Sequence, residues 1–220
     1  MKPRATRACL GPGPSNPARA EVNMRSIVLG VLGTMWAVAA VIAQGDSNPR
    51  PTCNMCPGTY IPVEELQAYT RKAIAEKLTD QQVRDIEIGK AHVGIGIVHR
   101  GKLDAPAPDS VAEHDLVSEV YHVIDGSATL VLGPDIVGMK RRPATLETVR
   151  LFNGPGNNGS SVRNGAAYQL KAGDVVVIPA GTGHWFTKID DHITYLMVRI
   201  DPDKVTPLKD EAASRAYLAK

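Results

Sequence analysis

Two short stretches, far apart in the chain, constrain the fold more than any other feature of the sequence. The later one, Gly173–Lys188, reads GDVVVIPAGTGHWFTK: a turn glycine, an apolar strand, and a Pro-Ala-Gly break shortly before His184. The earlier one, His114–Gly126, reads HDLVSEVYHVIDG and places His114 and Glu119 at the start of a strand. Each stretch predicts a strand-and-turn unit that presents one imidazole, and the earlier unit adds a carboxylate.

His114, Glu119 and His184 together form a candidate metal-binding set. Two imidazoles and one carboxylate can hold a divalent transition metal and leave coordination positions open for a substrate. Such a set suits Fe, Mn, Cu, Ni or Zn, and nothing in the sequence selects one of these metals. We therefore expect the three residues to meet around one ion, beside a small-molecule substrate or ligand.

Residues 83–202 are typical of an all-β, antiparallel sandwich or barrel. Short apolar runs follow one another between turn signals, and no helical pattern separates them. The dipeptide Asp125-Gly126 lies between two apolar runs and predicts a hairpin, and Asp190-Asp191 predicts a second one near the end of the region. A long connection, Gly133–Ser160, lies between the two motif-bearing regions.

Helical segments are expected on both sides of this β-region. Val63–Leu78 carries apolar residues at near-helical spacing and two acidic residues near its start, which predicts an amphipathic helix. Pro207–Lys220 predicts a short polar helix or tail. We accordingly divide the chain into an export segment (1–43), a leader with a helix (44–82), a barrel (83–202) and a C-terminal tail (203–220).

The N-terminal region has the layout of a secretory signal peptide. A basic start at Met24 is followed by the uncharged apolar run Ile27–Ile42, and small residues precede a cleavage position after Ala43. The alternative is a membrane anchor, but the run of 16 residues is shorter than the ~20 that a spanning helix needs. We expect a start at Met24 rather than Met1, with a secreted or periplasmic product.

Cys53 and Cys56 form a CNMC motif in the Pro-rich leader. In an exported protein a local disulfide is the first interpretation. A zinc site would need a second cysteine pair, and covalent haem would need a histidine where Pro57 stands. A structural disulfide is therefore favoured over a redox or metal role.

Composition narrows the range of partners. The net charge of +2 is spread without a basic block, and aromatic residues make up only 5% of the 220 residues. Neither feature is typical of a nucleic-acid-binding surface. We expect no nucleic-acid partner, and no membrane contact once the signal peptide is removed.

The two stretches resemble the motifs of the cupin superfamily. The pattern Gly173-(x)5-Pro179-x-Gly181-(x)2-His184 is similar to the second cupin motif, and Glu119-(x)6-Gly126 to the end of the first. The resemblance covers about residues 83–200 and implies a jelly-roll (double-stranded β-helix) barrel. It also implies a homodimer.

The chain departs from the cupin pattern at two positions. The first motif usually reads His-x-His, but Ala112 stands at the first of these positions and His114 at the second. Lys188 stands where an asparagine often closes the second motif. The usual set of three histidines and one glutamate is thus reduced to two histidines and Glu119.

The resemblance leaves the activity open. Oxidative, dioxygenase-like chemistry on a small organic molecule or sugar is favoured over isomerase or lyase chemistry. The alternative to an enzyme is a cupin that binds a small ligand without catalysis, because a reduced ligand set suits both. A fold of this kind does not by itself select a reaction.

Five further residues are candidates for the site. His122 is a possible additional metal ligand, although strand alternation from Glu119 places it on the outer face unless a bulge intervenes. Tyr121 is expected to point inward, as an acid/base group or as packing. His99 shares a strand face with Ile97 and is a candidate inward-facing catalytic or substrate contact.

Trp185 and Arg163 are the candidates for substrate contacts. Trp185 and Phe186 directly follow His184, so one of the two rings must point inward, either as packing or for stacking on a substrate. Arg163 lies next to a turn, where it could reach into the barrel mouth and bind a carboxylate or sugar acid, or simply face solvent.

Overall fold

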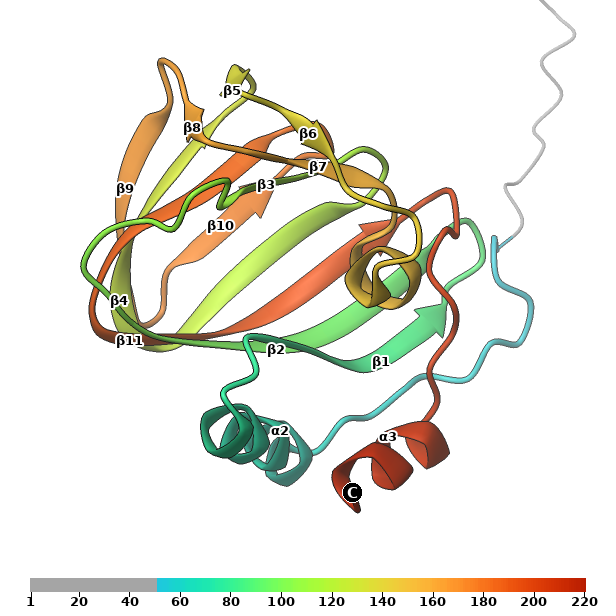
Figure 1. The fold of residues 1–220 in the computed structure, drawn as a ribbon. Coiled ribbons are helices and arrows are strands. Elements are labelled where there is room, and N and C mark those ends of the chain that lie inside the picture. The colour runs from blue at the N-terminus through green and yellow to red at the C-terminus, as the bar shows by residue number, and fades with distance from the viewer. Residues whose placement is uncertain (1–50) are drawn as a thin grey trace, which may run out of the picture. The chain divides into compact units, whose positions relative to one another are not determined.

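The structure is a computed structural model that describes residues 51–220, which form one compact unit. The predicted signal peptide, its cleavage site and the choice between Met1 and Met24 lie outside the described residues. Within the unit, strands occupy Asp80 to Asp201, with a helix on either side (Figure 1). Among the described residues, no helix has both the length and the apolar character needed to cross a membrane.

The described part of the chain contains eleven β-strands, and all of their pairings are antiparallel. They are β1 (Asp80–Glu87), β2 (His92–Leu103), β3 (Val111–His114), β4 (Ser118–Gly133), β5 (Ile136–Val137), β6 (Lys140–Arg141), β7 (Gly156–Gly159), β8 (Ser161–Val162), β9 (Ala166–Lys171), β10 (Val175–Ile178) and β11 (Gly183–Asp201). Nine of them form one sheet that curls around a common interior, and β5 pairs with β8 separately (Figure 1). The predicted antiparallel jelly-roll architecture is confirmed.

The two long strands, β4 and β11, turn the corner between the halves of this sheet. They pair with each other over nearly their whole length, and the register shifts between Lys188 and Ile193 and again before Tyr195. Gly126, opposite Ile193, takes a φ of +79°, which glycine adopts at little cost. The hairpins predicted at Asp125-Gly126 and Asp190-Asp191 are therefore wrong: at each dipeptide a single strand bends and continues.

The hydrophobic core lies between the two halves of the curled sheet. Its buried members come from alternate positions of several strands, as expected where one face of each strand is inward. They include Val98, Tyr121, Val123, Ala128, Leu130, Leu170, Ile178, Phe186, Ile189, Ile193, Tyr195 and Met197.

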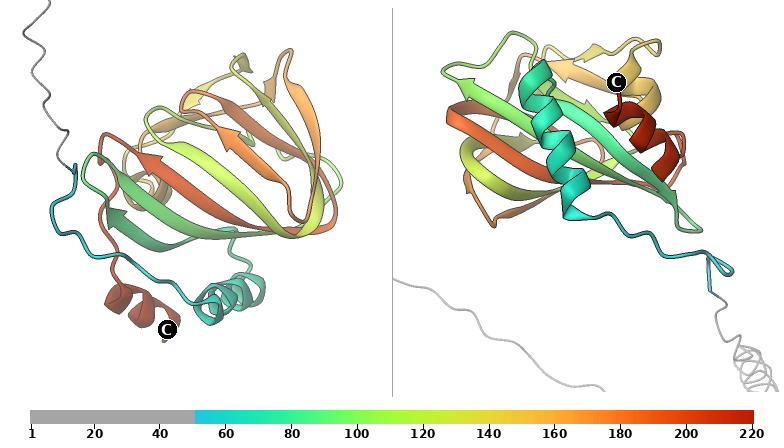
Figure 2. Two further views of the ribbon diagram at one scale, coloured as in Figure 1. Left: turned by 180° about the vertical axis from the view of Figure 1, so that it is seen from behind. Right: turned by 90° about the horizontal axis from the view of Figure 1, so that it is seen from below.

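Two helices cover the outer face of β1 and β2 (Figure 2). Helix α2 (Val63–Glu76) confirms the predicted amphipathic helix, and it ends where Lys77 adopts a left-handed conformation. Helix α3 (Glu211–Leu218) confirms the predicted C-terminal helix, and its N-terminus is capped by the side chain of Asp210. The helices meet through a stacked pair of rings, Tyr69 and Tyr217, with centroids 5.4 Å apart.

Because these helices cover its outer face, β2 is buried on both sides. Ile97 packs against Tyr69 of α2, whereas Val98 belongs to the barrel core. The face that holds Ile97 and His99 is therefore the outer one, and Arg100 lies on the inner one. The prediction that His99 faces inward is wrong, since period-two alternation separates two faces without saying which one lines the barrel.

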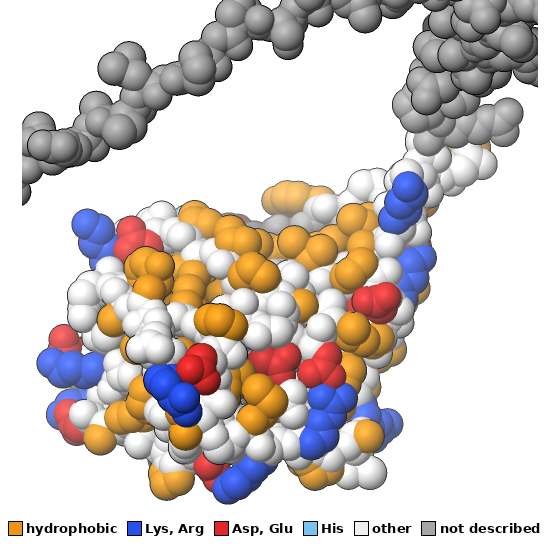
Figure 3. All heavy atoms as spheres, turned by 90° about the horizontal axis from the view of Figure 1, so that it is seen from above, with side chains coloured by type: hydrophobic (Ala, Val, Ile, Leu, Met, Phe, Trp, Pro, Cys, Tyr) orange, Lys and Arg blue, Asp and Glu red, His pale blue; other side chains and the backbone are white. Residues whose placement is uncertain are grey.

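The long connection between β4 and β9 is more structured than the sequence indicated. It contributes β5 to β8 and a short helical turn, η1 (Val149–Asn153). Viewed from above, this end of the barrel is a mixture of hydrophobic and charged side chains (Figure 3). In the leader, Cys53 and Cys56 form the predicted disulfide.

Candidate metal centre

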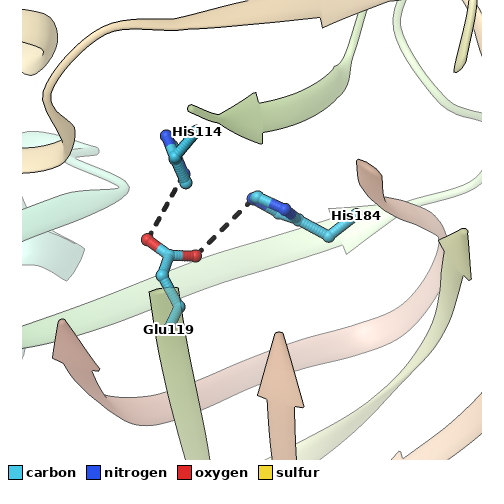
Figure 4. A group of neighbouring side chains, drawn as sticks. All are labelled: His114, Glu119 and His184. Atoms are coloured by element: carbon cyan, nitrogen blue, oxygen red, sulfur yellow. Dashed lines mark ion pairs between the residues drawn. The ribbon is translucent and has the colours of Figure 1, made fainter. Parts of the chain in front are cut away.

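Three strands deliver the candidate ligands to one point between the halves of the sheet. His114 ends β3, Glu119 lies near the start of β4, and His184 lies near the start of β11. Strand β11 pairs with β3 through His184 and Ala112, and with β4 over a long register, so both neighbours are fixed relative to His184. The three side chains point toward one another (Figure 4).

The distances within the cluster are short. Nε2 of His114 lies 3.4 Å from Oε1 of Glu119, and Nε2 of His184 lies 3.6 Å from Oε2 of the same carboxylate. One ligand atom from each residue lies within 4.8 Å of the others. All three side chains are almost fully buried, with exposed fractions of 4%, 1% and 6% in chain order.

The cluster fits a divalent metal by two criteria. Atoms bound to one ion at about 2.0–2.2 Å lie roughly 3 to 3.5 Å apart, which is close to the spacing seen here. In addition, Oε1 of Glu119 is buried and has no hydrogen-bond partner among the described residues. A buried carboxylate oxygen without a partner is costly, and a metal ion would satisfy it.

Glu119 is held in its charged form by its neighbours. Burial alone would raise the pKa of Glu119, but His114, His184 and Arg199 outweigh burial and hold it well below its usual range. The hydroxyl of Tyr121 donates a hydrogen bond to Oε2 of Glu119 at 2.8 Å. Burial and the nearby carboxylate raise the pKa of Tyr121, so its phenol stays protonated and remains a donor.

The two histidines differ in what contacts their other ring nitrogen. Nδ1 of His184 lies 3.3 Å from the carbonyl oxygen of Thr182, which favours a proton on Nδ1 and leaves Nε2 as a lone pair facing Glu119. Burial lowers the pKa of His184 to about 4, so the ring is neutral at neutral pH. His184 therefore has the tautomer that a metal ligand needs.

His114 has the opposite arrangement. A guanidinium nitrogen of Arg142 lies 2.9 Å from Nδ1 of His114 and also donates to the carbonyl oxygen of Glu113. Because arginine can only donate, Nδ1 must accept, and the proton of a neutral ring then lies on Nε2, facing Glu119. Binding of a metal through Nε2 would therefore require this proton and the Arg142 contact to rearrange.

A buried arginine supports the carboxylate from the other side. Arg199 is 1% exposed, and its Nε lies 3.5 Å from Oε1 of Glu119, while its other nitrogens contact Asp80 and Gln82. Room for it comes from a glycine: a Cβ added to Gly96 would lie 2.9 Å from a guanidinium nitrogen. Arg199 is thus the side chain that approaches the glycines of β2 closely.

Sequence reasoning missed both arginines. Arg142 lies in the long connection and Arg199 on an apolar strand, and neither belongs to a recognisable motif. The only sequence signal for Arg199 was the Gly-x-Gly pattern of β2, which indicated close approach without naming the residue.

The remaining candidates divide between the site and the surface. Tyr121 points inward, as expected. His122 is exposed because the register of β4 is continuous from Glu119 onward, so no bulge exchanges the faces, and its proposed role as a ligand is wrong. His99 binds Thr194 and stacks on His192, both away from the cluster.

Neither predicted substrate contact reaches the interior. Phe186 is the inward ring of its pair and packs with the core tyrosines, whereas Trp185 faces the other side and donates to Ser110. The side chain of Arg163 is 65% exposed and lies 3.7 Å from Asp135, so it is a solvated turn arginine. The expectation that either residue lines the barrel is wrong.

One family model and several solved structures are similar to this chain. A family model described as "AraC-like ligand binding domain" matches residues 158–219. Among solved structures, the chain resembles a cupin protein from Bacteroides fragilis (15% identity, 53% of this chain and 72% of that chain, TM-score 0.32). It also resembles a protein from Bacillus halodurans (12% identity, 74% and 98%, TM-score 0.38).

A third similar structure is an enzyme. Hydroquinone 1,2-dioxygenase from Sphingomonas sp., with 4-hydroxybenzoate bound, shares 12% identity over 54% of this chain and 69% of that chain, with a TM-score of 0.33. Identities and TM-scores this low say nothing about activity. No curated protein matches the chain in sequence.

Proposed function

We propose that this chain is a cupin and a metal-dependent enzyme that acts on a small organic molecule; its curled antiparallel sheet and the match of residues 158–219 to the AraC-like ligand binding domain support the first part. The observation that carries the proposal is the buried carboxylate of Glu119, which lies between two imidazoles and has one oxygen without a partner. Arg199 and the two imidazoles lie close to this carboxylate but leave Oε1 without a hydrogen bond, and a metal ion bound between the two imidazoles would satisfy that oxygen.

His184, Glu119 and His114 would hold the metal, an ion of the Fe, Mn, Cu, Ni or Zn type. The bound ion would supply Lewis acidity and open positions for the oxygen atoms of a substrate. Tyr121 acts as a positioning residue, because its hydroxyl fixes the orientation of the Glu119 carboxylate. Arg199 keeps that carboxylate charged and anchors it to β1 through Asp80.

Among possible reactions, we favour oxidation of the dioxygenase type over isomerisation or elimination. Sets of two histidines and one carboxylate leave positions for both a substrate and O2 on the same ion. A third imidazole at Ala112 would occupy one of these positions. Ala112 pairs in register with His184, so its small side chain lies next to the proposed ion.

Elemental analysis of the purified full chain is the first test. We expect about one transition-metal ion per chain, lost on substitution His184→Ala and retained on substitution His122→Ala, which alters an exposed histidine near the same site. With a panel of small aromatic and sugar substrates, O2 consumption should then depend on His184. A protein that holds no metal, or whose His184→Ala variant keeps full metal content, would contradict the proposal.

A second candidate function is binding of a small ligand without catalysis. It is favoured by the match of residues 158–219 to a ligand-binding domain family. The two functions differ in turnover: a binding protein would retain its metal or ligand at stoichiometric amounts and would consume no O2 with any substrate.

Two further proposals concern the whole protein. We propose that it is exported, on the basis of the apolar run and small residues before Gln44, and N-terminal sequencing of the exported form should begin at that residue. We also propose a homodimer, the usual state of cupins, which light scattering of the purified protein would test.

A further inference from the structure

Lys209 lies just before α3, where its backbone is fixed to the edge strand β1. The N–H of Lys209 donates to the carbonyl oxygen of Asp85 at 3.0 Å, and the N–H of Asp85 donates to the carbonyl oxygen of Lys209 at 3.1 Å. These two hydrogen bonds anchor the backbone from which the lysine side chain extends, so the position of its amine is set by the sheet and not by a free C-terminal segment.

The amine of Lys209 has only neutral neighbours. Its Nζ donates to the hydroxyl of Tyr69 at 3.1 Å and to the carbonyl oxygen of Gln82. It also lies 4.7 Å from the ring centroid of Tyr217. No aspartate or glutamate in the described part of the chain forms an ion pair with Lys209. The side chain is half-buried, so water does not fully replace the missing counter-charge.

The charged groups around this amine favour its neutral form. Burial and the cation of Arg84 lower the pKa of Lys209 to about 8, although Glu65 acts in the opposite direction. The effect of Glu65 is small because both of its carboxylate oxygens accept hydrogen bonds from Arg84, at 2.6 and 3.0 Å. The ring of Tyr217 favours the ammonium form, so the charged and neutral amines exchange near neutral pH.

The amine lies at the wall of a cleft of about 230 Å³ that residues of β1, η1 and α3 line. Lys209 belongs to the lining, and so do Gln82 and Tyr217, which are two of the three residues that the amine contacts. The third, Tyr69, is fully buried and is not part of the lining. The amine is therefore placed between a buried tyrosine and the cleft.

Most of the remaining lining is apolar. Glu147 is the one carboxylate in it, and Glu147 forms no ion pair with Lys209 among the described residues. None of the three candidate metal ligands lines this cleft. A lining of this kind suits a small molecule with an apolar body and no charge. Its apolar members are Leu151, Phe152, Pro207, Leu208 and Ala213.

We propose that Lys209 is a nucleophilic amine that binds small apolar aldehydes in this cleft as an imine. A lysine becomes a nucleophile when it is desolvated in an apolar pocket or lies near another cation, and here the cleft and Arg84 supply both conditions. The nitrogen lone pair attacks the carbonyl carbon and a C–N bond forms. The carbonyl oxygen then leaves as water with the two amine hydrogens. The step consumes no oxidant or reductant, and it does not use the proposed metal centre.

Reductive labelling of the purified full chain with benzaldehyde tests the proposal. Cyanoborohydride reduces an imine to a stable amine, and mass spectrometry of the peptides then gives the labelling rate of each lysine. Lys204, which is exposed and paired with Glu87, is the internal reference. At pH 7.4 about 20% of an amine with a pKa of about 8 is neutral, against about 0.1% of an ordinary lysine. A less basic amine is also a weaker nucleophile, so we expect Lys209 to be labelled at least roughly 10-fold faster than Lys204.

Two controls separate the cleft from the amine alone. Ala213→Trp fills the cleft without changing the lysine and should abolish the excess labelling of Lys209, whereas Ala212→Trp, at an exposed position outside the lining, should not. Glycolaldehyde, which is small and polar, should show less preference for Lys209 over Lys204 than benzaldehyde does, and this comparison needs no variant. Equal benzaldehyde labelling of the two lysines, undiminished labelling of Lys209 in Ala213→Trp, or the same preference with both aldehydes would overturn the inference.

Discussion

Two pairs of histidines in this protein use the same residue types for opposite purposes. Inside the barrel, the rings of His114 and His184 lie with centroids 5.1 Å apart around the carboxylate of Glu119. Outside, His99 and His192 stack with centroids 5.6 Å apart, and His192 contacts two aspartates. Each cluster contains two imidazoles and at least one carboxylate.

Burial separates the two clusters. It lowers the pKa of His184 to about 4, because water cannot stabilise a charged ring there. At His192, hydrogen bonds to Asp125 and Asp191 raise the pKa, because the partners favour the charged ring and burial is slight. A neutral imidazole can bind a metal and a protonated one cannot, so the comparison teaches that surroundings, and not composition, make the inner cluster the candidate centre.

The largest expected effect is on the charge network of the inner cluster. Arg199→Met should lower the free energy of unfolding by roughly 3–5 kcal/mol, because it leaves Glu119 and Asp80 buried without their cation. Arg215→Met removes an exposed helical pair with Glu211 and should cost no more than about 0.5 kcal/mol. Urea denaturation measures the free energy of unfolding of both variants. A similar loss of stability in the two would contradict the distinction between the buried charge network and an exposed ion pair.

The next effect is on metal affinity. His184→Ala should weaken binding of a transition metal by more than about 100-fold. The substitution removes a neutral ligand, and loss of a ligand lowers metal affinity more than loss of a residue that supports a ligand. His192→Ala, from the outer cluster, should leave metal affinity unchanged. Competition with a coloured chelator reports both values, and a comparable loss in His192→Ala would place the metal on the surface.

A smaller effect, in the opposite direction, is expected at Arg142. Arg142→Met removes the donor that holds Nδ1 of His114 as an acceptor, so this ring can take the tautomer that binds metal through Nε2. Metal affinity should rise by roughly 10-fold, which is the lower end of the effects seen when a residue that contacts a metal ligand is substituted. Arg141→Met, at the exposed neighbour that pairs with Asp115, is the control. Weaker binding in Arg142→Met would show that the arginine supports the ligand.

The smallest effect concerns pH and the outer cluster. The pKa of His192 is raised in the folded protein, so its contribution to stability is complete below about pH 6.5 and is lost as the pH rises through the folded-state value. Because the pair is largely exposed, the contribution should be only roughly 0.5 kcal/mol or less. NMR titration should give a pKa above the ordinary value for His192, and Asp125→Asn should lower it. An unchanged value in that variant would show that Asp125 does not set it.

Part of the fold and part of the site could be predicted because their signals are local. The strand-and-turn units around His114 and His184, the amphipathic helix and the Cys53–Cys56 pair each depend on residues close together in sequence. The two hairpin predictions were wrong because they also used only local signals. Asp125-Gly126 has the chemistry of a tight turn, but only the pairing of β4 with β11 shows that the strand bends instead.

The sequence by itself determined which face of β4 carries the site residues, since alternation from Glu119 places Tyr121 inward and His122 outward. Only the tertiary structure decided which face of β2 lines the barrel, because helices cover the other face and both are apolar. It alone also brought in Arg199, whose partner Asp80 is 119 residues away. Ion pairs over such separations follow from how the strands close, and no local pattern records them.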